Sequence, residues 1–225
     1  MKTSDSRKPR RLRWIILAIL LAGIAWLGFD LYGPHHHQMR NFDPNEVARL
    51  ETAMWRSYYD KEQVKLFNQL TELLRTQYGM PFATSNTVAY QAAKGAFVFK
   101  EGKKREDYEK ALPYLEKFYQ AIRDGADIDF DVRKAAKLEL EWWIIHRQRD
   151  KHQPGDLDRA LAELPAELYR IPAERLMEHG RLRQEAMTIR DQKAEAGGVT
   201  EADWRKIEEL LRVSWKSLFN AVNVS

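Results

Sequence analysis

A run of sixteen uncharged residues near the N-terminus constrains this chain more than any other feature. It extends from Trp14 to Phe29 and continues, after one acidic residue, towards Tyr32. Twenty helical residues at about 1.5 Å each span roughly the 30 Å hydrocarbon core of a bilayer. Trp14, Trp26 and Tyr32 lie near the ends of the run, where aromatic side chains favour the headgroup region. The run therefore predicts a transmembrane signal-anchor helix over residues 14–33.

The charges before this run predict its orientation. Residues 1–13 contain six Lys or Arg and a single acid, Asp5, for a net charge of +5. Basic residues beside a span stay on the cytoplasmic side. We expect a basic cytoplasmic tail over 1–13 and a periplasmic or extracellular domain after the span, in a single-pass membrane protein. A cleaved signal peptide is the alternative, although no clean Ala-x-Ala cleavage site follows the apolar run.

Charge and cysteine content exclude several classes of function. The 212 residues after position 13 carry 31 Lys and Arg against 32 Asp and Glu, so the net charge of +4 belongs to the tail. A nucleic-acid-binding domain needs a basic surface on its folded part. We therefore predict no nucleic-acid partner. The absence of Cys excludes disulfides, thiolate metal sites and a cysteine nucleophile.

The span is followed by a polar segment over 34–42, which we interpret as a juxtamembrane linker. It contains three consecutive histidines, His35-His36-His37, and imidazole is a common metal ligand. Adjacent residues on a flexible linker offer a metal no fixed geometry. The triple histidine is therefore interpreted as part of a polar linker, with metal binding as the alternative.

Residues 43–225 have the pattern of an all-helical domain. Asp43-Pro44-Asn45-Glu46 combines an N-cap, a first-position proline and a capping-box acid. Thr84-Ser85-Asn86 is expected to cap a later helix, and Pro113 predicts a kink or a later helix start. Apolar residues recur at spacings of three and four, and no window alternates with the period of a strand. The expected fold is all-α: a bundle of seven or eight helices, or stacked helical hairpins.

Carboxylates and one histidine fall on helix faces that otherwise look buried. Glu139 and His146 share a face with Trp142, and Glu51 shares one with Val47, Met54 and Tyr58. Glu178 and Glu185 lie on a face with Leu182 and Ile189. Burial of such groups without partners is costly. They are the candidate site residues: Glu51, Glu139, His146, Glu178 and Glu185, with Tyr58 nearby.

This candidate cluster has a chemical and a structural interpretation. Carboxylate-rich bundle interiors hold di-iron and di-manganese sites, but those use Glu-x-x-His twice, and none of the six histidines has an acid three residues before it. The structural interpretation pairs the glutamates with Arg56, Arg147, Arg181 or Arg183. These residues remain candidates, no residue is assigned as a metal ligand, and no cofactor is predicted.

The short motifs of common enzyme classes are missing, including the phosphate-binding glycine loops, His-Glu-x-x-His and Gly-x-Ser-x-Gly. We therefore expect a protein-interaction or scaffold module at the membrane. Its partners would be the lipid bilayer through residues 14–33 and a membrane or extracytoplasmic protein. The alternative is a ligand- or metal-binding bundle, with or without enzymatic activity, that uses the Glu/His cluster.

Overall fold

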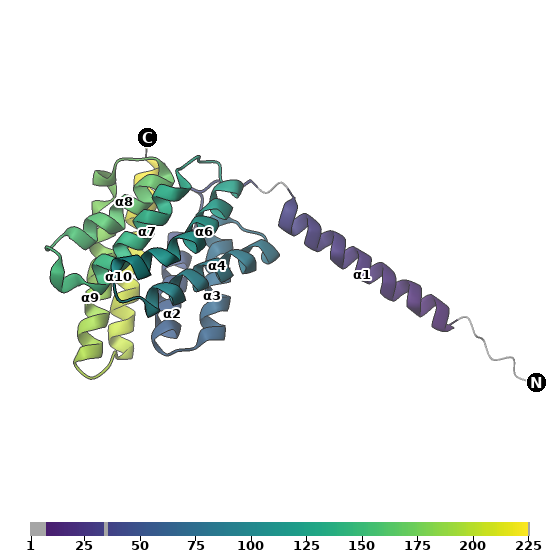
Figure 1. Ribbon diagram of the computed structural model, residues 1–225, viewed down its shortest axis with the longest axis horizontal. Helices are drawn as coiled ribbons and strands as arrows, with labels where there is room; N and C mark the ends of the chain where they lie inside the picture. The colour runs from purple at the N-terminus through teal and green to yellow at the C-terminus, as the bar shows by residue number, and fades with distance from the viewer. Residues whose placement is uncertain (1–7, 34–35, 225) are drawn as a thin grey trace, which may run out of the picture.

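A computed structural model describes residues 8–33 and 36–224 of the chain (Figure 1). Most of its described residues are helical and none belongs to a strand, which confirms the all-α prediction. Short 3₁₀ turns occupy Glu109–Ala111, Arg149–Lys151 and Ala173–Leu176. The α-helices are α1 (Lys8–Tyr32), α2 (Pro44–Tyr59), α3 (Gln63–Tyr78), α4 (Phe82–Glu101), α5 (Arg105–Tyr108), α6 (Leu112–Gly125), α7 (Val132–Arg147), α8 (Asp156–Tyr169), α9 (Met177–Glu195) and α10 (Glu201–Asn223).

The helices after α1 form a closed bundle of consecutive neighbours. Helix α2 packs on α3, α3 on α4, α4 on α6, and each later helix on the next one. Helix α10 then packs back on α2, so the last helix meets the first. Connections are short, which makes successive helices antiparallel neighbours. Apart from the single turn of α5, α2 to α10 are eight helices, which agrees with the expected number.

Several helix boundaries follow from the signals in the sequence. The Asp43 carboxylate accepts hydrogen bonds from the backbone N–H groups of Asn45 and Glu46 and caps α2. Thr200 and Asp203 form a reciprocal capping box at α10. Pro113 lies at the second residue of α6, so it marks a later helix start and not a kink. Local side-chain chemistry therefore determines these ends.

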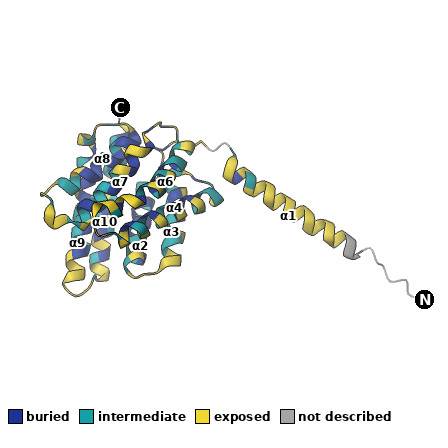
Figure 2. Cartoon of the chain, in the orientation of Figure 1, coloured by how far each residue is buried: buried dark blue, intermediate teal, exposed yellow. Residues whose placement is uncertain are grey.

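The core lies along the seams between neighbouring helices, as the dark-blue inner faces in Figure 2 show. Its members come from every long helix of the bundle, among them Leu74, Leu115, Leu161, Ile207 and Leu211. These positions belong to apolar stripes with helical spacing. Burial of such side chains contributes about 25 cal/mol per Å² of apolar surface and drives the packing.

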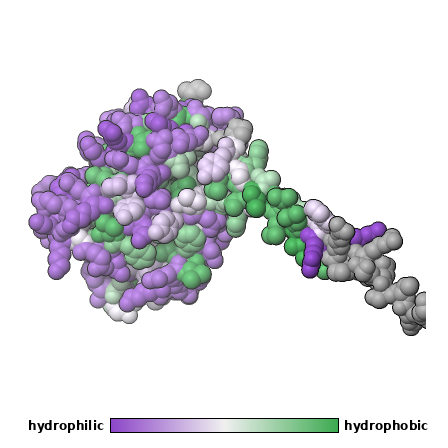
Figure 3. Space-filling view, turned by 45° about the vertical axis from the view of Figure 1, so that its right-hand side comes forward, coloured by the Kyte–Doolittle hydropathy of each residue, from purple (hydrophilic) through white to green (hydrophobic). Residues whose placement is uncertain are grey.

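Helix α1 extends away from this bundle (Figure 1). Within Arg11–Tyr32, an eighteen-residue segment has a mean hydropathy of 2.2, so this helix is long and apolar enough to cross a membrane. Its large side chains are exposed along most of its length. Figure 3 shows the same contrast between the apolar helix and the polar surface of much of the domain.

The C-terminal end of α1 is attached to α4 through Asp30. The buried Asp30 carboxylate accepts hydrogen bonds from the backbone N–H groups of Ala83, at 3.0 Å, and Thr84, at 3.2 Å. The Thr84 hydroxyl donates in turn to the Asp30 carbonyl at 2.8 Å. The prediction that Thr84-Ser85-Asn86 caps this helix is therefore wrong: α4 begins at Phe82, and its cap comes from a residue 53 positions earlier.

Residues 36–42 are part of the domain, in contrast to the free linker expected over 34–42. Met39 and Phe42 are buried in the core, and the backbone N–H of Met39 donates to the Asp127 carboxylate. His37 forms a parallel bridge with Ala126, and its ring lies within hydrogen-bonding distance of the Gln77 carbonyl. The apolar side chains of Met39 and Phe42 explain this docking. Of the triple histidine, His35 lies outside the described residues.

Candidate functional site

The first candidate, Glu51, lies in the centre of the bundle and binds two partners. One carboxylate oxygen accepts two hydrogen bonds from the Arg183 guanidinium, at 2.9 and 2.6 Å. The other accepts from the Trp215 indole N–H at 2.6 Å. The Glu51 side chain is only 5% exposed and that of Arg183 17%. These three residues bring α2, α9 and α10 together around one buried ion pair.

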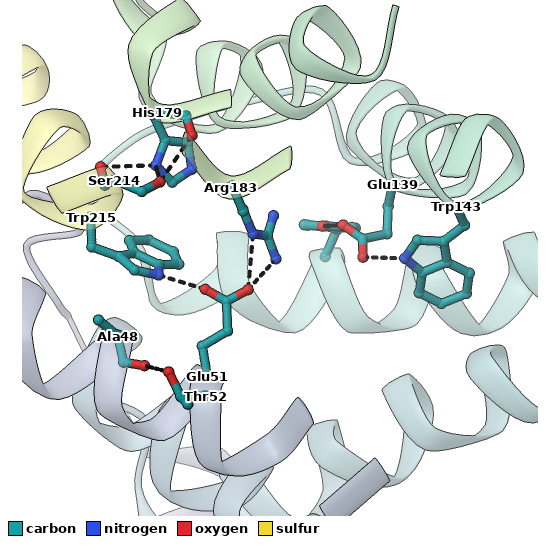
Figure 4. A network of polar contacts seen from close by, with 10 residues as sticks. Ala48, Glu51, Thr52, Glu139, Trp143, His179, Arg183, Ser214 and Trp215 are labelled. Atoms are coloured by element: carbon teal, nitrogen blue, oxygen red, sulfur yellow. Dashed lines mark hydrogen bonds and ion pairs between the residues drawn. The ribbon is translucent and has the colours of Figure 1, made fainter. Parts of the chain in front are cut away.

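Glu139 lies on the other side of Arg183 (Figure 4). Its carboxylate accepts from the buried Tyr119 hydroxyl at 2.7 Å and from the Trp143 indole N–H at 2.8 Å. The Arg183 guanidinium also lies over the ring of Trp142, 5.3 Å from its centroid. Two of the predicted carboxylates thus share one polar network, which we call the Arg183 network (Glu51, Glu139, Arg183, Tyr119, Trp143 and Trp215).

The electrostatics of this network hold Arg183 in its charged form. Burial alone would lower the pKa of Arg183, but the charge and hydrogen bonds of Glu51, with the charge of Glu139, outweigh burial and raise it. Burial and the charge of Glu139 raise the pKa of Tyr119 well above its ordinary value. Tyr119 therefore stays a neutral donor. The network is a charge-paired structure whose donors and acceptors already have partners.

His179 lies next to this network on α9 and is fully buried. Its Nδ1 is 2.8 Å from the Ser214 hydroxyl oxygen, and the same hydroxyl donates to the His179 carbonyl at 2.9 Å (Figure 4). Burial, together with the charge of Arg183, lowers the pKa of His179 to about 3. The imidazole is thus neutral at physiological pH and acts as a packed hydrogen-bonding group between α9 and α10.

His146, the predicted histidine, belongs to a second and separate cluster. Its Nε2 lies 3.2 Å from the Asp191 carboxylate, which also accepts from Arg149 at 2.8 Å and Arg190 at 3.0 Å. Burial would raise the pKa of Asp191, but the hydrogen bonds from His146 and Arg190 outweigh burial and lower it. We call this the Asp191 cluster; it joins α7 to α9.

Glu178 and Glu185 do not enter either cluster. Both bind Arg181 on the surface of α9, at 2.9 and 3.2 Å. Glu178 is exposed and Glu185 is half-buried. The face they were expected to share is not the buried one, because α9 buries His179, Gly180 and Ala186 with Leu182. Tyr58 is likewise exposed.

The five candidate residues therefore occupy three places and do not converge. Among residues 8–33 and 36–224, no group of three His, Asp or Glu side chains could hold a metal ion. The structural interpretation is confirmed for Arg181 and Arg183, which pair with the predicted glutamates. Arg56 instead pairs with Glu201, and Arg147 donates to backbone carbonyls at the end of α4.

A shallow open groove lies between α6 and the start of α7 and is wide enough to be considered as a ligand site. Four basic and four acidic side chains line it, together with apolar groups such as Phe130 and Val132. Arg170, on its rim, is bound to Glu167 at 2.9 Å. The groove contains none of the five candidate residues, and its mixed charges favour no particular class of ligand.

No family model, curated protein or solved structure matches this chain. Conclusions about its role therefore depend on its own residues and their arrangement.

Sequence reasoning identifies both acids of the Arg183 network but misses the centre of the Asp191 cluster and the partner of His179. Asp191 and Ser214 were not singled out, because nothing local marks a residue whose partner lies 35 or 45 positions away. Trp215, in contrast, could have been identified from the sequence as a buried hydrogen-bond donor. It lies on the apolar stripe of α10, and a buried indole N–H needs an acceptor. Glu51, on another apolar stripe, was a carboxylate in need of a donor.

Proposed function

We propose that this chain is a single-pass, membrane-anchored interaction module that holds its helical domain in a fixed position at the membrane surface. One observation carries the proposal: the apolar helix α1 is attached to the domain at its very end. Asp30 caps α4, and residues 36–42 lie within the fold. A flexible linker would only confine the domain near the membrane, whereas this attachment also orients it. Such an orientation is useful for binding a neighbouring membrane or extracytoplasmic protein.

The chemistry of the candidate residues supports this proposal over the catalytic alternative. A catalytic acid or base needs access to a substrate. Here the Glu51 carboxylate is enclosed and accepts from Arg183 and Trp215, and the Glu139 carboxylate accepts from Tyr119 and Trp143. These contacts join helices to one another. Their arrangement suits a rigid module better than a reaction centre.

We expect the anchor to be uncleaved, with its N-terminus cytoplasmic. The natural absence of Cys allows thiol probes to be placed one at a time. In intact cells, a membrane-impermeant maleimide should label Lys216→Cys, on the exposed surface of α10, and not Ser6→Cys, in the basic tail. Permeabilised cells are the control and should label both. Labelling of the tail position in intact cells would reverse the topology, and release of the chain by alkaline extraction would disprove the anchor.

Asp30→Ala is expected to loosen the attachment of α1 without unfolding the domain. Loss of a cap costs about 1 kcal/mol, which corresponds to roughly a fivefold faster opening of the capped turn. Hydrogen exchange of the Ala83 and Thr84 amides, measured in lipid nanodiscs, should accelerate by about this factor. Asp30→Asn is the matched control because it retains an acceptor oxygen, and it should exchange nearly as slowly as the wild type. Equal hydrogen-exchange rates in the wild type and the two variants would mean that Asp30 does not stabilise the first turn of α4.

The interaction role itself is tested on native membranes. Solubilised in mild detergent, the full chain should sediment with a second polypeptide in constant stoichiometry. Asp30→Ala should retain the anchor but reduce that stoichiometry, because the domain is no longer oriented. Sedimentation of the wild type on its own, or turnover of a substrate by the purified chain, would overturn the proposal.

A further inference from the structure

The attachment at Asp30 determines where the start of α4 lies along the axis of α1. Asp30 lies two residues before the end of α1, about 3 Å along a helix axis. Its carboxylate oxygen is 3.0 Å from the backbone nitrogen of Ala83, so the first turn of α4 lies at the level of the last turn of α1. If α1 is a membrane span, that level is the headgroup layer. The first turn of α4 then lies in this layer as well.

The side chains of α4 suit such an environment. Phe82, Tyr90 and Phe97 are 54%, 52% and 51% exposed. At 100° per residue, their positions fall within about 80° of one another around the helix. Most other large apolar side chains of the domain are buried or half-buried, so a row of three exposed aromatic residues calls for a contact. Aromatic rings are the side chains that favour the membrane–water interface.

Basic side chains accompany these rings. The Arg75 guanidinium lies 5.8 Å from the centroid of the Phe82 ring, and the Lys94 ammonium lies 5.8 Å from that of Tyr90. Helix α4 contains no acidic residue before Glu101. Rings and cations side by side resemble the apolar and basic faces that place amphipathic helices on anionic lipid.

Helices α3 and α4 form a helical hairpin, and its charge differs from that of the rest of the domain. Residues 63–100 contain four Lys or Arg and one acid, Glu72, for a net charge of +3. The other residues of 34–225 sum to −3. The hairpin is therefore a basic part of an otherwise acidic domain, and it is the part that adjoins α1. Its charge is complementary to an anionic bilayer surface.

We propose that the hairpin face, defined as Arg75, Phe82, Tyr90, Lys94 and Phe97, rests on the anionic lipid surface at the C-terminal end of α1. Phe82 enters the interfacial layer beside α1, and Arg75 and Lys94 bind lipid phosphates. This inference depends on the membrane anchoring proposed above and extends it. The chain would then have a second membrane contact, and the domain would lie against the bilayer with α3 and α4 facing it.

Site-directed spin labelling of the full chain tests this contact. Phe82→Cys, Tyr90→Cys and Phe97→Cys are each labelled with a nitroxide and reconstituted in vesicles of phosphatidylcholine with phosphatidylglycerol. Val213→Cys is the matched control, because Val213 is 48% exposed and lies on α10, which packs on α9 and α2. Collision rates with oxygen, which partitions into lipid, and with a water-soluble nickel chelate report the depth of each label.

We expect the ratio of the oxygen collision rate to the nickel collision rate to be several-fold higher at position 82 than at position 213. Positions 90 and 97 should have intermediate ratios. In vesicles of phosphatidylcholine alone, the ratios at 90 and 97 should fall, because a basic residue near anionic lipid shifts binding by about fivefold. Position 82, held by Asp30, should keep its ratio. Ratios at all three positions equal to that at 213 would overturn the lipid contact.

Two further outcomes separate this proposal from its alternatives. If the labels are water-exposed in vesicles but shielded in native membranes, the hairpin face binds a protein and not lipid, and the proposal fails. Alkaline extraction of the same vesicles tests the anchor independently. Retention of the chain with water-exposed labels would reject the lipid contact and leave the anchor intact, whereas release of the chain would reject both.

Discussion

Arg183→Met is expected to lower the free energy of unfolding by about 3–5 kcal/mol, the usual cost of removing one partner from a buried ion pair. Glu51 would lose both hydrogen bonds from Arg183 but would remain enclosed beside Trp215. Glu139 would lose the positive charge that lies next to it. Methionine has a comparable length and no charge, so the change removes the electrostatic contact and leaves little cavity. Urea titration of the detergent-solubilised chain, followed by circular dichroism, measures the effect.

Arg181→Met is the matched control for this substitution. Arg181 lies two residues earlier on α9 and binds the carboxylates of Glu178 and Glu185, but its side chain is 49% exposed. Solvent-exposed ion pairs contribute about 0–1 kcal/mol, so this variant should be nearly as stable as the wild type. Similar losses in the two variants would show that the Arg183 network contributes no more than a surface pair.

A second substitution tests whether the loss is electrostatic. Glu51→Gln removes the charge but retains a carbonyl oxygen that can accept from Trp215. Combined with Arg183→Met, it should restore part of the lost stability, because the unpaired buried charge has been removed. A double variant less stable than Arg183→Met would mean that the damage is caused by packing.

The fold class could be predicted because it depends on local patterns. Helical spacing of apolar residues and caps such as Asp43 and Thr200 act within one helical turn, and the structure contains both caps. The same reasoning failed at α4, whose cap is Asp30. The sequence shows that Asp30 interrupts an apolar run, but it does not show which N–H groups that carboxylate meets.

The candidate site could be predicted only in part for a related reason. The apolar stripe of α2 indicates that Glu51 is buried and needs a cation, and Arg183 is one of the four arginines expected to pair with the glutamates. Their separation of 132 residues leaves the choice of partner to the tertiary fold. On α9, polar and apolar residues are spread almost evenly around the helix. Its buried face was therefore misassigned to Glu178 and Glu185, whereas His179 and Gly180 occupy it.

Gly180 explains why this face of α9 can be buried so closely. A Cβ at this position would lie 2.1 Å from the carbonyl oxygen of Asp158 and 3.3 Å from the backbone nitrogen of Ala162. Both atoms belong to the backbone of α8, so no side-chain rotation can relieve the overlap. Gly in a helix interior costs about 1 kcal/mol relative to Ala. The chain bears this cost where α8 and α9 approach each other.

Gly180→Ala is therefore expected to destabilise the domain by about 3 kcal/mol or more, at the upper end of the range for overpacked cores. Helices α8 and α9 would have to separate, which would also disturb the contact of His179 with Ser214. Gly95→Ala is the control, since it makes the same change inside α4. Its Cβ would meet Leu115 at an ordinary 3.5 Å, so the gain of about 1 kcal/mol in helix propensity should make this variant neutral or more stable. Thermal unfolding of the two variants measures the difference, and equal midpoints would show that α8 and α9 are not packed backbone to backbone at Gly180.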